Sequence, residues 1–140
     1  MKRKFYLDTA IWRDYFEDRR DCLQPLGEFA FQFLKNCEKE GCEVLYSELV
    51  TRELLAYYSE ERVKQVFSSF SGILRLVEIT KEQADEVKII RNKTPGAHNA
   101  DILHAIIACD NEAILITRDR HFEALTGIVR VLKPEEVTFF

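Results

Sequence analysis

The segment Phe5-Tyr6-Leu7-Asp8-Thr9 runs from apolar residues into an acidic one, and this pattern decides the fold. The later segment Ala113-Ile114-Leu115-Ile116 is apolar at every position, which is typical of a parallel strand covered by helices on both faces. Short runs of this kind, rich in β-branched and aromatic residues, are predicted to be strands at 5–8, 43–47, 74–79, 113–117 and 128–132.

Segments long enough for helices separate these runs. In the longest of these segments, at 24–40, the apolar residues recur at helical spacing and form a stripe. Phe31 lies outside this stripe, and we expect it to be either a lone surface aromatic or part of a partner contact. We expect helices at about 10–19, 24–40, 48–57, 59–72, from the cap at Thr80 to 92, at 99–110 and at 119–125, with a terminal turn at 133–136. The alternation of strands and helices predicts an α/β fold, a three-layer α/β/α sandwich with a central parallel sheet of about five strands.

Length and composition limit the class of protein. A chain of 140 residues with 46% hydrophobic residues is expected to form one domain over 1–140 with its own core. No apolar run approaches the ~18 residues of a membrane span, and the run after Lys2-Arg3-Lys4 is too short for a secretory signal, so we expect a cytoplasmic protein. Its cysteines have no zinc-ribbon spacing and are expected to be free thiols: Cys22, Cys37, Cys42 and Cys109.

Acidic residues occur where buried segments end or helices begin. Asp8 closes the first run, Glu53 follows the second by six positions, Asp101 opens an apolar helix, and Asp119 follows the fourth run by two. Because parallel α/β sheets bind ligands at the carboxyl ends of their strands, these four carboxylates could share one cleft. Mutual repulsion would then require protonation, solvation or cations, and an all-oxygen pocket suits Mg²⁺ or Mn²⁺. The pattern favours metal-dependent hydrolysis of a phosphodiester.

The segments that carry these acids resemble a known family. They are similar to those of the PIN domain, the ribonuclease fold of VapC-type toxins and of several RNA-processing nucleases. The resemblance covers the chain from end to end in four motifs, at 6–12, 47–54, 100–105 and 115–122. It implies that Asp8, Glu53, Asp101 and Asp119 are both the catalytic and the metal-binding residues, with Mg²⁺ or Mn²⁺ as cofactor. It also implies cleavage of RNA that leaves a 5′-phosphate and a 3′-hydroxyl.

The resemblance extends to neighbouring residues and to partners. Thr9 and Thr117 resemble hydroxyl positions that hold a carboxylate or a metal-bound water, although Thr9 could instead cap the following helix. RNA would be the substrate, an antitoxin a candidate protein partner, and a homodimer the expected assembly. The net charge of −4 does not exclude RNA, because four acids in one metal site would account for the excess. Candidate phosphate contacts, otherwise solvated helix ends, are Arg91, Lys93, Arg118 and Arg120.

The aromatic and imidazole side chains near the acids could each have either a structural or a functional role. His104 lies one turn after Asp101, but a histidine on an apolar helix is more often a hydrogen-bonded core residue, so we expect no histidine chemistry there or at His98 and His121. Trp12 is expected to pack against the helix at 24–40, the alternative being a base stacked on its ring.

Other functions compete with the nuclease hypothesis. A haloacid-dehalogenase-like phosphatase needs a second aspartate two residues after the first, where this chain has Ala10. A receiver domain needs paired acids at the first strand and a lysine near the last, where this chain has Thr117-Arg118-Asp119. A catalytically silent PIN-fold module that binds RNA or protein is expected to have lost one or more acids, and none is missing here. Whether such a nuclease is a toxin or a housekeeping RNA-processing enzyme stays open.

Overall fold

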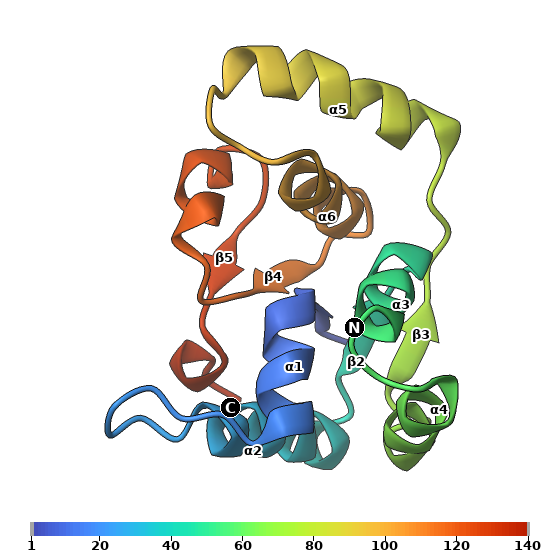
Figure 1. Cartoon of the computed structure of the whole chain (residues 1–140), viewed down its shortest axis with the longest axis vertical. Coiled ribbons are helices and arrows are strands. Elements are labelled where there is room, and N and C mark those ends of the chain that lie inside the picture. Colours follow the sequence, from blue (N-terminus) through green and yellow to red (C-terminus); the bar gives the residue numbers. More distant parts are fainter. Residues whose placement is uncertain (1, 140) are drawn as a thin grey trace.

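The computed structural model describes residues 2–139, and its centre is a five-stranded, all-parallel sheet in the order β3-β2-β1-β4-β5 (Figure 1). This arrangement confirms the predicted fold class. The strands are β1 (Lys4–Leu7), β2 (Glu43–Tyr46), β3 (Leu74–Leu76), β4 (Ile114–Ile116) and β5 (Val131–Leu132).

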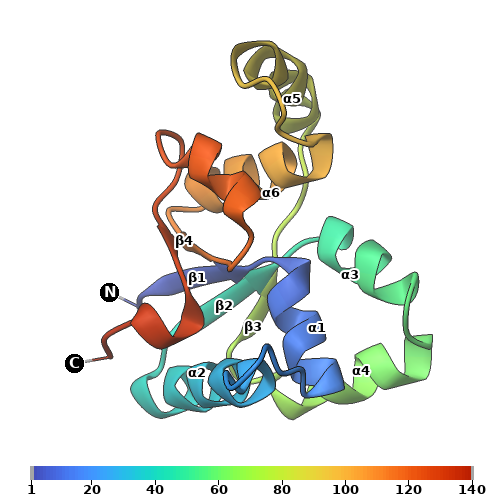
Figure 2. The ribbon, with the colours of Figure 1, turned by 60° about the vertical axis from the view of Figure 1, so that its left-hand side comes forward.

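Helices cover both faces of the sheet. In Figure 2 the sheet lies between α2 with α1 on one side and α6 with α5 on the other, so the three layers are seen nearly edge-on. No helix within residues 2–139 combines the length and the apolar character that a membrane span needs. The helices are α1 (Thr9–Glu17), α2 (Leu26–Glu40), α3 (Glu48–Leu55), α4 (Glu60–Ser69), α5 (Lys81–Lys93), α6 (Asn99–Asp110) and the short 3₁₀ helices η1 (Arg120–Leu125) and η2 (Pro134–Glu136).

Strand β1 is the middle of the sheet and of the core. Its residues Phe5, Tyr6 and Leu7 are each 0% exposed, because the strand is paired on both edges and covered on both faces. Backbone pairing continues one step past the strand, where the Asp8 N–H donates to the Ile116 carbonyl at 3.1 Å. The first acid is therefore anchored directly to the end of a buried strand.

Several boundaries differ from the predictions for local reasons. β5 is shorter than 128–132 because the Ile128 N–H donates to the Leu125 carbonyl and closes a turn first. α2 begins at Leu26 rather than near residue 24 because Asp21 and Gln24 pair with each other as an isolated bridge. The segment predicted as a final helix is 3₁₀ in character, whereas the cap predicted at Thr80 is a full capping box with Gln83.

Trp12 and Phe31 both pack on aromatic residues of neighbouring helices. Trp12 is 0% exposed and packs against Phe67 of α4, with ring centroids 4.7 Å apart, and its burial excludes a stacked base. Phe31 is half-buried, and its ring stacks on Tyr15 at 6.2 Å, so it joins α2 to α1 rather than standing on the surface.

The cysteines are free thiols, as predicted. Cys37 and Cys42 are buried where α2 ends, and the Cys42 N–H donates to the Cys37 carbonyl at 3.0 Å. Between them, Gly41 ends the helix with a φ of 70°, a left-handed conformation that glycine adopts without strain.

Gly27 is where α2 approaches the end of α1 most closely. A Cβ at this position would meet the Asp18 Cα at 2.5 Å and the Asp14 carbonyl oxygen at 2.9 Å, and both are backbone atoms. We therefore expect Gly27→Ala to destabilise the fold by about 1–3 kcal/mol, the usual cost of overpacking, and to lower the melting temperature by several degrees. Gly72→Ala is the matched control, since a Cβ there meets nothing within 4 Å. Equal melting temperatures for the two variants would contradict this account.

Candidate metal centre

Three neighbouring strands end in polar residues at the same edge of the sheet. Asp8 follows β1, Ser47 follows β2 and Thr117 follows β4, and these side chains are 6%, 0% and 2% exposed. Because the strands are parallel and adjacent, their carboxyl ends bring together residues that are far apart in the sequence. The candidate site is built on this edge.

Asp8 is held by bonds to both of its oxygens. Oδ1 accepts the Ala10 N–H at 2.7 Å, which caps α1, and Oδ2 accepts the Thr117 hydroxyl at 2.5 Å. Burial raises the pKa of the Asp8 carboxyl, and these two bonds only partly offset it. The carboxylate is thus fixed in direction but costly to ionise without a cation nearby.

Glu53 reaches the site from α3 and has the opposite electrostatic balance. Its Oε1 accepts the Thr9 hydroxyl at 2.6 Å and lies 2.7 Å from His104 Nε2. Burial alone would raise the pKa of Glu53, but the bonds to His104 and Thr9 outweigh it and hold the pKa below its usual range. Asp8, not Thr9, is the cap of α1, so the Thr9 hydroxyl serves Glu53.

A buried hydrogen-bond chain orients His104. The Tyr6 hydroxyl lies 2.8 Å from His104 Nδ1 and 2.8 Å from the Ser47 hydroxyl. An ionised Glu53 can only accept, so His104 Nε2 donates to it. Burial raises the pKa of Tyr6, which keeps its hydroxyl protonated between His104 and Ser47. His104 is therefore a hydrogen-bonded core residue, as predicted, and it also positions Glu53.

Asp101 and Asp119 come from α6 and from the start of η1. Ligand atoms of Asp101, Asp119 and His121 all lie within 4.8 Å of one another, close enough to hold one metal ion. Burial and the nearby charges of Asp119 and Asp8 raise the pKa of Asp101. The Asp119 N–H donates to the Thr117 hydroxyl at 3.1 Å, and that hydroxyl donates to Asp8. Thr117 therefore connects the first acid to the last.

The sequence-predicted acids thus meet at one edge. The charge of Asp119 opposes the ionisation of both Asp8 and Asp101, and the charge of Asp8 opposes that of Asp101 as well. Glu53 joins them through its bonds to Thr9, the neighbour of Asp8, and to His104. The donor set is rich in carboxylate oxygen, held by rigid strand ends and helix starts, and it fits a hard divalent cation.

The basic residues predicted to contact phosphate differ in their exposure and in their pairing with other side chains. Arg118 is only 16% exposed at its side chain, because its guanidinium makes two bonds to Glu135 at 2.6 and 2.7 Å and lies 3.7 Å from Asp14. Arg91, Lys93 and Arg120 are exposed, and Arg91 donates to Asn99 at 3.3 Å. Arg118 is thus occupied as a brace between η2 and α1, whereas the other three remain accessible.

Supporting residues that the sequence reasoning missed are Tyr6, Ser47 and Asp14. Tyr6 is the one residue with a polar tip inside the apolar run of β1, and Ser47 ends β2 as Asp8 ends β1. Asp14 lies between apolar positions of α1, is 4% exposed, and lies 3.7 Å from Arg19 and from Arg118. A polar group in an otherwise buried pattern was the available signal in each case.

Comparison with known proteins places this fold. No family model matches the chain, and no curated protein does. Among solved structures, a toxin–antitoxin complex from Klebsiella pneumoniae matches with a TM-score of 0.66 at 19% identity, over 95% of this chain and 99% of that chain. VapBC2 from Rickettsia felis, bound to a promoter DNA fragment, matches with a TM-score of 0.67 at 16% identity, over 93% of this chain and 98% of that chain. FitAcB from Neisseria gonorrhoeae matches with a TM-score of 0.65 at 22% identity, over 95% of this chain and 99% of that chain.

These matches are similarities of fold, since all three identities are below 25%. The matches span nearly the whole of both chains, so the similarity extends over the entire fold and not over a single βα unit. The PIN-like fold predicted from the sequence is confirmed, and it is the fold of these chains from toxin–antitoxin complexes.

Replacing Asp101 tests the electrostatic strain of the metal-free site. Its pKa in the folded state is raised, so ionising it at neutral pH weakens the folded state relative to the unfolded chain. Asp101→Asn should therefore raise the melting temperature in a chelator at pH 7 by a few degrees. The gain should shrink as the pH falls through the folded-state pKa and vanish below the ordinary aspartate value of ~3.9, where both states are protonated.

Calorimetry between pH 3 and 7 would measure this pH dependence. The control is Asp85→Asn on α5, which removes an exposed carboxylate away from the site. A gain for Asp101→Asn that did not depend on pH, or that matched the control, would count against the electrostatic explanation.

Proposed function

We propose that this protein is a metal-dependent endoribonuclease that uses Mg²⁺ or Mn²⁺ and hydrolyses phosphodiester bonds of RNA, with Asp8, Glu53, Asp101 and Asp119 as its catalytic and metal-binding residues. The observation that carries the proposal is the convergence of these carboxylates at the carboxyl edge of the sheet, where Asp119 acts electrostatically on Asp8 and Asp101 and shares a cluster of ligand atoms with Asp101. Buried and half-buried acids that repel one another cost stability, and a bound cation would offset that cost.

The chain's own residues would do most of the positioning. Asp8, fixed between the Ala10 N–H and the Thr117 hydroxyl, offers its remaining lone pairs in one direction. Glu53, whose pKa the bonds to Thr9 and His104 hold below its usual range, would add a negative charge at the same edge. Asp101 and Asp119 would add two further carboxylates close to each other. Such rigid ligands hold a cation and its phosphate at a defined distance.

Bound divalent cations supply the chemistry in this class of site, because they lower the pKa of water and stabilise the charge that develops on the leaving oxygen. RNA would approach over exposed cations at the rim, for which Arg91, Lys93 and Arg120 are the candidates. Arg118 is left out, because it is already paired with Glu135 and Asp14.

A toxin role is the biological context that we propose, with an antitoxin as partner, a homodimer as the assembly and the cytoplasm as the location. The support is the likeness of fold to chains from toxin–antitoxin complexes over nearly the whole length. Growth arrest on expression of the wild-type chain, but not of Asp8→Asn, is the outcome expected of a toxin. A wild-type chain that cleaved RNA but left growth unaffected would favour the housekeeping alternative.

Amide substitutions in the site test the activity directly. Asp8→Asn, Glu53→Gln, Asp101→Asn and Asp119→Asn keep the size of the side chain but remove a charge that holds the cation, so RNA cleavage should fall by orders of magnitude. RNA affinity should survive or increase, because one charge that repels phosphate is gone. Cleavage of labelled RNA and equilibrium binding would be measured on the same preparations.

Control variants for this experiment are Lys93→Ala and Arg120→Ala, which should weaken binding and reduce its salt dependence by about one counterion per lost contact. Normal cleavage by the four amide variants would refute the nuclease proposal and favour a binding module.

Metal binding can be tested without any substrate. Because only the folded chain brings the four acids together, millimolar Mg²⁺ or Mn²⁺ should raise the melting temperature of the wild type. The rise should be lost in Asp8→Asn and kept in Asp85→Asn. An unchanged melting curve of the wild type at millimolar metal would contradict the site.

A further inference from the structure

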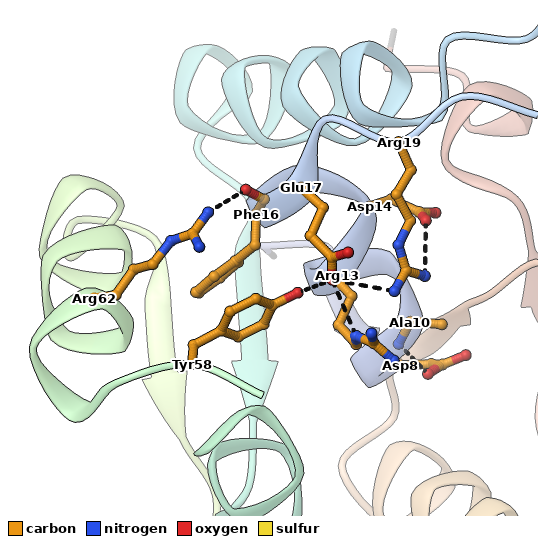
Figure 3. Close-up of polar contacts among 9 residues, drawn as sticks. All are labelled: Asp8, Ala10, Arg13, Asp14, Phe16, Glu17, Arg19, Tyr58 and Arg62. Carbon is orange, nitrogen blue, oxygen red and sulfur yellow. Dashed lines mark hydrogen bonds and ion pairs between the residues drawn. The ribbon is translucent and has the colours of Figure 1, made fainter. Parts of the chain in front are cut away.

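A strip of arginine and tyrosine side chains leads away from the metal centre along α1. Figure 3 shows Asp8 at the start of this helix and a group formed by Arg13, Glu17 and Tyr58 further along it. Tyr57 belongs to the same strip: the Arg13 guanidinium lies 3.6 Å from the centre of its ring. Tyr57 is 61% exposed, which is unusual for so large an aromatic residue.

The strip is in register with the acids because of helical periodicity. The Thr9 hydroxyl contacts Glu53 at 2.6 Å, so α1 and α3 touch at the metal centre. Four residues later on each segment, Arg13 contacts Tyr57, and the Tyr57 N–H still donates to the Leu54 carbonyl at 3.0 Å, so the chain keeps turning past the end of α3. One helical turn is ~5.4 Å, so the second contact lies about one turn from the first.

The surroundings of Tyr57 favour an aromatic ligand with negative charge. Arg13 holds one side of the ring, and its side chain stays 24% exposed. Arg62 lies 5.0 Å from the ring centre of Tyr58, in the same group. The carboxylate of Glu17 is paired with Arg13 at 3.3 Å and with Arg19 at 3.1 Å, so two guanidinium groups meet one carboxylate here.

From these contacts we infer that Tyr57 and Arg13 form a binding site for a nucleotide of single-stranded RNA next to the phosphate held at the metal centre. The open part of the Tyr57 ring would stack on the base, and Arg13 would meet the adjoining phosphate. Stacking accepts any base, because every base has a π-face, so this site would confer affinity and orientation without sequence preference. The inference rests on the proposed ribonuclease function and adds a substrate-binding site to it.

Binding measurements on an uncleaving background test the inference. In Asp8→Asn, the affinity for a short oligouridylate would be compared with that for an abasic ribose-phosphate oligomer of the same length and charge. Tyr57→Ala should weaken oligouridylate binding roughly tenfold and leave the abasic oligomer unaffected. Tyr57→Phe should retain the affinity, because the ring is kept. Arg13→Gln should weaken both oligomers and reduce the salt dependence by about one counterion.

The matched control is Ile89→Ala on α5. Ile89 is apolar and 56% exposed, and its substitution should change the binding of neither oligomer. Melting temperatures of all variants would verify that they are folded. If Tyr57→Ala bound both oligomers like its parent, or weakened both equally, the stacking site would be refuted and the strip would be left to a protein partner. An absence of cleavage by the wild type with metal would instead refute the proposed function, so the two failures are distinguishable.

Discussion

The burial of Asp8 at the end of the central strand is the constraint on which the rest of the structure depends. β1 is hydrogen-bonded to a strand on each edge and covered on both faces, and Asp8, which follows it, is only 6% exposed. The N–H of Ala10 and the hydroxyl of Thr117 solvate its carboxylate instead of bulk water. The residual cost appears as a raised pKa, and it is the reason that a cation would stabilise this edge of the sheet.

Around Asp8 the other acids are held by different means, and this divides their electrostatic roles. Glu53 is stabilised as an anion by Thr9 and His104, and His104 is oriented in turn by Tyr6. Burial and the charges of Asp119 and Asp8 oppose the ionisation of Asp101. One site thus contains a carboxylate that is ionised without metal and others whose charge a metal would favour. Metal binding should consequently release protons and depend on pH.

The helices serve the site as well as the core. α1 starts at the candidate metal centre, capped by Asp8. Its Asp14 is paired with Arg19 and Arg118, and its end packs against α2 at Gly27. α3 carries Glu53 to the same edge, and Tyr57 follows it beside Arg13. The surfaces that would meet RNA therefore lie on elements whose other faces are fixed in the core.

The sequence by itself determined the layered α/β fold and the identity of the acids, because apolar runs with strand character and acids after them are local patterns that parallel packing makes meaningful. It could also predict His104 as a core histidine and the cap at Thr80, since both depend on near neighbours. The tertiary structure decided what depends on distant partners. Arg118 pairs with Glu135 and Asp14, Trp12 packs on Phe67 of α4, and the Thr9 hydroxyl donates to Glu53. Such pairings join residues from separate elements, and no periodicity within one element encodes them.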